Sequence, residues 1–166
     1  MTRQDRELAI ADNVAYVDKA LAQAIGPRPK AQEDQAQGLA LKEQEEPNLG
    51  PWPSAFGLIF LGFSQGASMA YRAAVLGRHR GAGIVAIAGD IPPELRISPR
   101  ASWAPVLLLA GARDEWFTSQ KLSEDADWLA QREIPHEVVR FDGGHEWTDE
   151  VRSQIGAFLR RVVNRR

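Results

Sequence analysis

Four short apolar runs, each ending in a glycine or an aspartate, alternate with amphipathic segments along most of the chain. They are FGLIFLG (56–62), GIVAIAG (83–89), APVLLLAG (104–111) and HEVVRFD (136–142). Strands and helices that alternate in this way build a parallel sheet from right-handed βαβ units. We therefore predict an α/β fold with a parallel sheet of about four strands and flanking helices.

Helical periodicity marks the segments between and around these runs. The predicted helices cover residues 5–25, 64–76, 121–132 and 148–163. In the first of them, apolar side chains recur at Leu8, Ala11, Val14, Ala15, Val17, Leu21, Ala24 and Ile25. Gly26 and Pro27 then stop that helix.

The chain is predicted to form a single domain, 1–166, in three parts. The N-terminal helix (1–25) is followed by an atypical polar, proline-rich insertion (26–53), which we interpret as a surface excursion. The remaining residues, 54–166, hold the alternating strands and helices and form the predicted core.

Composition argues against several classes of protein. The formal net charge of -2 gives no electrostatic reason to expect a nucleic-acid partner. The first ten residues lack the apolar centre of a signal peptide, and no apolar run is long enough to cross a membrane. The absence of cysteine excludes disulfides and a thiol nucleophile and fits a reducing compartment, so we expect a cytoplasmic protein.

Ser64 lies in the pentapeptide Gly62-Phe63-Ser64-Gln65-Gly66, between a predicted strand and a predicted helix. A nucleophilic serine on such a turn projects its hydroxyl group, and the free N–H groups of the helix N-terminus favour developing negative charge. A serine in this position is also an ordinary N-cap residue beside two packing glycines. The pentapeptide alone leaves both interpretations open.

A serine nucleophile needs a base, and the base needs an acid that orients it. His145, in FDGGHEW, and Asp114, in GARDEWFT, each follow a predicted strand, so both fall on the same sheet edge as Ser64. Asp90 follows the preceding strand and is the rival acid, with Glu115 as a further alternative. We favour Asp114 because its loop neighbours the histidine loop in a sequentially ordered sheet.

The other histidines and nearby acids are poorer candidates. His79 and His136 fall at the opposite end of the predicted strands, where a solvated role is expected. Asp142 and Glu146 are too close to His145 in sequence to orient its ring easily.

The segments GFSQGA, AGDIPPEL, GARDEWFT and FDGGHEW together resemble the phospholipase/carboxylesterase branch of the α/β-hydrolases. That branch includes bacterial carboxylesterases and acyl-protein thioesterases, and the resemblance covers about residues 54–159. It implies that Ser64 is the nucleophile, Asp114 the acid and His145 the base, in the chain order of that superfamily. It also implies that the backbone N–H of Gln65 forms half of an oxyanion hole, and that no metal or cofactor takes part.

Four aromatic side chains flank these residues and are candidate walls of an acyl pocket: Phe63, Trp116, Phe117 and Trp147. Aromatic residues near strand ends also commonly pack under loops. The one candidate lid, residues 91–103, is short. This favours a small-molecule ester with a short to medium acyl chain, or a thioester, because the acyl chemistry is the same.

The resemblance also predicts missing parts. Hydrolases of this type begin with several more strands, one of which carries a His-Gly loop that supplies the second oxyanion donor. No such loop precedes Ser64, so we expect an N-terminally shortened, minimal fold whose second donor comes from residues 26–56 or from another subunit.

The run FGLIFLG would then be an edge strand, covered either by residues 26–53 or by a second chain, and we expect a homodimer or larger assembly. The alternative to an esterase is a weak or inactive hydrolase that acts as a binding or assembly module.

Overall fold

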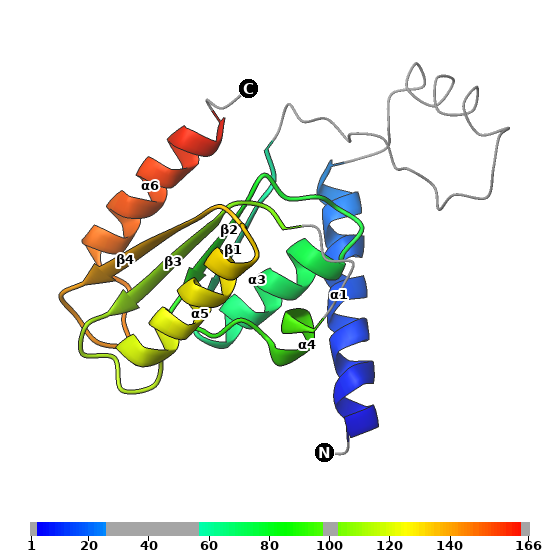
Figure 1. The fold of residues 1–166 in the computed structure, drawn as a ribbon. Helices are drawn as coiled ribbons and strands as arrows, with labels where there is room; N and C mark the ends of the chain where they lie inside the picture. The colour runs from blue at the N-terminus through cyan, green and yellow to red at the C-terminus, as the bar shows by residue number, and fades with distance from the viewer. Residues whose placement is uncertain (1–2, 26–56, 98–102, 164–166) are drawn as a thin grey trace, which may run out of the picture.

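The computed structural model describes residues 3–25, 57–97 and 103–163, and the predicted insertion at 26–53 lies outside them. Its centre is a parallel sheet of four strands in the order β1-β2-β3-β4 (Figure 1). The strands are β1 (Ile59–Phe63), β2 (Gly83–Ile87), β3 (Val106–Gly111) and β4 (His136–Phe141). The α/β architecture predicted from the sequence is therefore confirmed.

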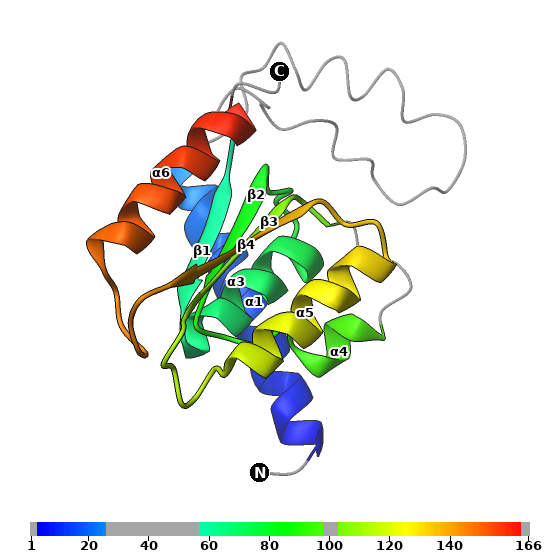
Figure 2. The ribbon, with the colours of Figure 1, turned by 60° about the vertical axis from the view of Figure 1, so that its left-hand side comes forward.

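Helices cover both faces of this sheet (Figure 2). They are α1 (Arg3–Ile25), α3 (Gln65–Leu76), the single turn α4 (Pro93–Arg96), α5 (Ser119–Gln131) and α6 (Asp149–Val163). Helix α3 packs on β1 and β2, and α5 packs on β3 and β4 of the same face, whereas α6 packs on β2, β3 and β4 of the opposite face. Helix α1 lies against α3 at the β1 side of the molecule.

The two central strands carry the hydrophobic core. Every residue of β2 and β3 is buried, as expected for parallel strands covered on both faces. The register explains which side chains meet which helix: Ile84 lies beside Val106 on the α3–α5 face, and alternate residues point to α6. On the α6 face, Phe158 packs over Gly83, where an added Cβ would lie 2.9 Å from its ring.

Strand β1 lies at one edge of the sheet, and among the described residues its ladder partner is β2 alone. Phe60 points to the α3 face and is buried with Ala70 and Ala73. Leu61 points to the other face, where α6 packs chiefly on β2 to β4, and Leu61 is 45% exposed. Within the described ranges, β1 thus has the edge position expected for it.

The N-terminal helix is anchored by fewer of its apolar residues than its sequence suggested. Val17 and Leu21 pack against the Phe60 cluster, whereas Leu8, Ala11 and Ala15 are exposed. The helix docks along one narrow stripe, because only one of its sides faces α3. Beyond that stripe, both Asp18 carboxylate oxygens accept the backbone N–H of Arg78, at 3.0 and 3.1 Å.

The candidate lid is partly built into the core. Ile91 and Leu95 are buried, and Pro93 opens the short helix α4, where its missing N–H costs no hydrogen bond. Residues 98–102 lie outside the described part of the chain. The described half of this segment is therefore an anchored connection between β2 and β3.

Asp125 is the buried carboxylate that fastens this connection to α5. Its side chain is 1% exposed, its Oδ2 accepts the Ile91 N–H at 2.9 Å, and its Oδ1 pairs with the Arg96 guanidinium. Burial raises the pKa of Asp125 to about 6, although the Ile91 N–H and the Arg96 charge act in the opposite direction. The pair thus carries a desolvation cost that its contacts only partly offset.

This raised pKa predicts a pH-dependent stability. In the native state Asp125 keeps its proton up to about pH 6. In the unfolded chain an aspartate has a pKa of about 3.9 and releases its proton near that pH. The contribution of this group to the free energy of unfolding therefore falls as pH rises from about 4 to about 6, on the order of 2 kcal/mol.

Asp125→Asn replaces the titrating carboxyl group with an amide that does not titrate. The free energy of unfolding of the wild type, measured in urea titrations relative to this variant, should therefore fall as pH rises from about 4 to about 6. Groups with lowered pKa values, such as Asp114 and Glu94, give slopes of the opposite sign, but these are common to both proteins and cancel in the difference. Asp127→Asn, on the exposed side of α5, is the matched control. A difference between wild type and Asp125→Asn that stays constant from pH 4 to 7 would contradict the assignment.

Candidate active site

Ser64 occupies the single-residue turn between β1 and α3. Its backbone has φ 55° and ψ -123°, a strained conformation for a residue with a side chain. Two hydrogen bonds hold it there: its N–H donates to the Ile87 carbonyl at 2.8 Å, and its carbonyl accepts the Ala67 N–H at 3.0 Å. Its side chain makes no capping bond to α3. Ser64 is thus held as a projecting side chain and does not act as an N-cap.

The glycine before this turn is required by space. A Cβ on Gly62 would lie 2.0 Å from the Gly66 carbonyl oxygen and 2.5 Å from the Ala67 nitrogen, since the helix doubles back over the strand. A Cβ on Gly66 would meet nothing within 4 Å. The close crossing of strand and helix therefore requires a glycine at Gly62. At Gly66 there is room for a side chain.

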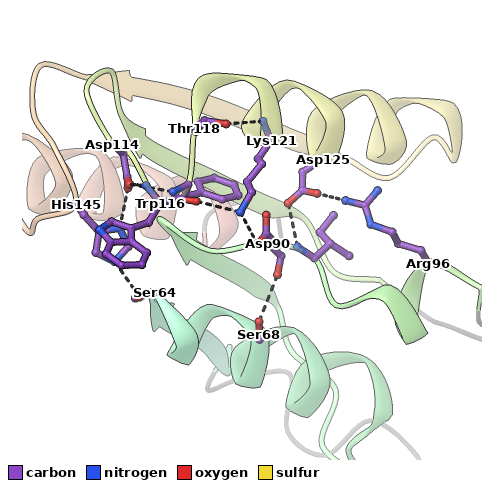
Figure 3. Close-up of polar contacts among 12 residues, drawn as sticks. Ser64, Ser68, Asp90, Arg96, Asp114, Trp116, Thr118, Lys121, Asp125 and His145 are labelled. Carbon is purple, nitrogen blue, oxygen red and sulfur yellow. Dashed lines mark hydrogen bonds and ion pairs between the residues drawn. The ribbon is translucent and has the colours of Figure 1, made fainter. Parts of the chain in front are cut away.

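Ser64, His145 and Asp114 form a continuous hydrogen-bonded series (Figure 3). His145 Nε2 lies 2.8 Å from Ser64 Oγ, and His145 Nδ1 lies 2.8 Å from Asp114 Oδ2. Because a carboxylate only accepts, Nδ1 carries the ring proton and Nε2 is free to accept the serine proton. The structure thus brings together, from three different loops, the three residues that the sequence predicted as nucleophile, acid and base.

The Asp114 carboxylate is held ionised by its donors. Its side chain is fully buried, and this burial acts to raise its pKa. The backbone N–H groups of Phe117 and Trp116 donate to Oδ1 at 2.9 and 2.8 Å, and His145 donates to Oδ2. Together these bonds outweigh burial and lower the pKa of Asp114 below its ordinary value.

The loops that carry the acid and the base are joined through their backbones. The Arg113 N–H donates to the Gly143 carbonyl at 2.8 Å. Gly111 lies so close to the histidine loop that a Cβ on it would be 2.2 Å from the Gly144 carbonyl oxygen. Phe63 packs its ring against the imidazole of His145, with centroids 5.0 Å apart. These contacts fix the imidazole between the nucleophile and the acid.

Three of the other acids near the site have partners of their own. Asp90 forms an ion pair with Lys121 at 3.5 Å, Asp142 pairs with Arg113, and Glu146 accepts the Gly144 N–H at 3.0 Å. Glu115 is exposed.

The other two histidines lie at the amino-terminal ends of the strands, away from Ser64. His79 precedes β2, and His136 begins β4 with its Nδ1 2.8 Å from the Ile134 carbonyl oxygen.

The four predicted pocket residues have different surroundings. Trp116 is 76% and Trp147 44% exposed, on the loops that carry the acid and the base. Phe63 is half-buried against His145. Phe117 is only 2% exposed and belongs to the hydrophobic core, so its backbone N–H, and not its ring, serves the site.

Gln65 is the first residue of α3, so its backbone N–H has no acceptor within the helix and lies next to Ser64.

Within the described ranges, no group of three or more His, Asp or Glu residues is arranged to hold a metal ion. None of the helices in this part of the chain is long and apolar enough to cross a membrane.

Comparisons with known proteins point to one family. The family model described as phospholipase/carboxylesterase matches residues 43–160. No curated protein matches the chain.

Among solved structures, the chain is similar to esterase PE8, with 28% identity and a TM-score of 0.57, over 63% of this chain and 49% of that one. It has the fold of SOBER1 from Arabidopsis thaliana (15% identity, TM-score 0.65, 99% of this chain and 67% of that one). It also shares its fold with acyl-protein thioesterase 2 from Zea mays (21%, 0.53, 63% and 55%). The chain thus spans about half the length of esterase PE8 and about two thirds of SOBER1.

The two glycines beside Ser64 provide a matched pair of substitutions. Gly62→Ala places a methyl group against the backbone of α3, which cannot yield as a side chain would, so we expect a loss of about 2–4 kcal/mol in the free energy of unfolding. Gly66→Ala adds the same atom to open space in a helix and should change stability by no more than about 1 kcal/mol, in the stabilising direction. Urea unfolding of both variants checks this, and equal stabilities would show that the crossing is looser than described.

Proposed function

The chain belongs to the phospholipase/carboxylesterase family, and from this premise we propose that it is a serine esterase acting on small carboxylic esters. The observation that carries the proposal is the series Ser64–His145–Asp114, with 2.8 Å at each step and a strained turn beneath the serine. Esters of short to medium acyl chains are the proposed substrates, and thioesters fit the same acyl chemistry. The absence of cysteine supports our placement of the enzyme in the reducing cytoplasm.

The proposed reaction begins with attack of Ser64 Oγ on the acyl carbonyl carbon. His145 Nε2 takes the hydroxyl proton as the bond forms, and the Asp114 carboxylate, bonded to Nδ1, stabilises the resulting imidazolium. The tetrahedral oxyanion develops beside the N-terminus of α3, where the Gln65 N–H is the proposed donor.

Collapse of the tetrahedral intermediate breaks the bond to the leaving group. His145 delivers its proton to the leaving alcohol or thiol, and the acyl group stays on Ser64. Water then attacks the acyl-enzyme, with His145 again taking a proton, and releases the carboxylic acid. Every proton in this cycle passes through Nε2, which explains why the orientation of the ring matters.

The number of oxyanion donors limits which substrates are expected. Loss of one donor typically lowers kcat by about 100- to 1000-fold. With the Gln65 N–H as the one donor we assign, an activated ester remains a suitable substrate, whereas an amide, with its poorer leaving group, does not. A second donor from residues 26–56, or from another copy of the chain, would widen that range.

Hydrolysis of a p-nitrophenyl ester tests the proposal. Ser64→Ala and His145→Ala should reduce the rate to background, and Asp114→Asn should lower kcat by about 10⁴-fold because the ring tautomer is no longer fixed. His79→Ala, at the opposite sheet edge, should match the wild type. A fluorophosphonate probe should label the wild type and not Ser64→Ala. Folded wild type without labelling would favour the alternative, a non-catalytic binding or assembly module.

We also propose that a second copy of the chain covers β1. The strand is apolar, forms the edge of the sheet and leaves Leu61 45% exposed, which is a surface prone to pairing with another strand. Two copies related by a twofold axis would pair their β1 strands antiparallel and extend the sheet across the interface.

Light scattering at micromolar concentration should therefore report a dimer, and Leu61→Lys should shift it toward monomer because a charge opposes strand pairing. Val138→Lys, which alters an exposed valine of β4, is the matched control and should leave the mass unchanged. A monodisperse wild-type monomer would overturn this proposal without affecting the esterase proposal.

A further inference from the structure

Lys121 connects two loops of the site, the loop that carries the acid and the loop after β2 (Figure 3). Its Nζ donates to the Trp116 carbonyl at 2.9 Å, in the loop that carries the acid, and lies 3.5 Å from Asp90 Oδ2, in the loop after β2. Lys121 stands in the first turn of α5, where the helix dipole disfavours a cation. Its position is therefore explained by these two acceptors and not by helix stability.

On one side, Lys121 completes the hold on the acid. Trp116 donates its N–H to Asp114 Oδ1 and offers its carbonyl to Lys121, so this one residue is fixed from both ends. Thr118 caps α5 by accepting the Lys121 N–H at 3.4 Å. A shift of the Trp116 backbone would move a donor of Asp114 and, through Asp114, the imidazole of His145.

On the other side, Lys121 contacts the loop that supports the nucleophile. Gly89, next to Asp90, lies against the serine turn so closely that a Cβ on it would be 2.4 Å from the Ser64 carbonyl oxygen. Ala88 before it has φ 52°, a strained conformation that depends on the surrounding structure. Asp90 therefore belongs to the segment on which the Ser64 turn rests.

Asp125 reinforces this attachment from within. It lies four residues after Lys121, on the same side of α5, and accepts the N–H of Ile91, the residue after Asp90. The Ser68 hydroxyl, on α3, approaches the Asp90 carbonyl at 3.5 Å. The segment at 90–91 is thus held between α3 and α5, and Lys121 is the contact that extends this hold to the acid loop.

We propose that Lys121 and Asp90 are a positioning pair that keeps the acid loop and the serine turn at their working separation. The proposal rests on the proposed esterase function, since neither residue touches the reacting atoms. The side chains are 44% and 52% exposed, and an ion pair so open to solvent adds little to stability. A misplacement of about 1 Å in a site of this kind, by contrast, can cost about 100-fold in rate.

The decisive comparison is Lys121→Met, which keeps the length of the side chain and removes its charge. We expect kcat on a p-nitrophenyl ester to fall by about 10- to 100-fold, with KM within about 2-fold of wild type because substrate contacts remain. The melting temperature should stay within about 3 °C. Asp90→Asn should behave in the same way, and the double variant should lose little more than either single one. Lys121→Arg, which keeps the charge and the donors, should recover most of the rate.

Arg161→Met is the matched control. Arg161 forms an equally exposed ion pair with Glu137, but at the other edge of the sheet, so its loss should leave kcat unchanged. Unchanged kcat in Lys121→Met, or a loss of rate that parallels a loss of stability, would overturn the proposal.

Hydrogen–deuterium exchange separates this proposal from the esterase proposal. The backbone N–H groups of Trp116 and Phe117 should exchange faster in Lys121→Met than in the wild type and in Arg161→Met, whatever the activity of the protein. Equal exchange in all three would overturn the positioning role, whereas an inactive wild type would overturn the proposed function.

Discussion

The close crossing of β1 and α3 at Ser64 is the constraint on which the rest of the site depends. A residue with φ 55° persists only where its neighbours leave it no alternative. Here the constraint comes from the Ile87 carbonyl, from the Ala67 N–H and from the packing of Gly89 beneath the turn. The turn is therefore set by β2 and α3 as much as by its own pentapeptide, and the strands that follow need only bring an acid and a base to the same edge.

The two buried aspartates show that the pKa of a carboxylate depends on the balance between its burial, its hydrogen-bond donors and the neighbouring charges. Asp114 receives two backbone N–H bonds and one imidazole N–H, and its pKa is lowered. Asp125 receives one backbone N–H and one guanidinium, and its pKa is raised to about 6. Asp114 is suited to holding a cationic imidazole ring. Asp125 is suited to joining α5 to the segment between β2 and β3 near neutral pH.

The sequence was sufficient to predict the alternation of strands and helices, because buried parallel strands and amphipathic helices have distinct apolar periods. The ends of the elements were less well predicted: the strand expected at 56–62 runs from Ile59 to Phe63, because its ladder with β2 extends to the pair Phe63 and Ile87. Strand ends also predicted which residues share an edge, and Ser64, Asp114 and His145 do lie together there.

What periodicity could not show was which side chains meet across elements. Phe117 was a candidate pocket wall, but its ring is in the core, since only the packed loop fixes its direction. Nothing local in the sequence distinguishes Lys121 from a surface lysine. Asp125 did carry a signal: an acidic residue within the apolar stripe formed by Leu122 and Leu129 indicates a buried partner.

The edge position of β1 has a consequence for how the protein responds to heat. An edge strand has one neighbour to hold it, so edges open at a lower free-energy cost than the centre of a sheet. Strand β1 ends in Phe63, which packs against the imidazole of His145, and leads directly into Ser64. Fraying of β1 would displace Ser64 and, at the same time, the Phe63 ring that packs against His145, while β2 and β3 remain packed. Where no second copy pairs with β1, we therefore expect activity to be lost at a lower temperature than the packing of β2 and β3.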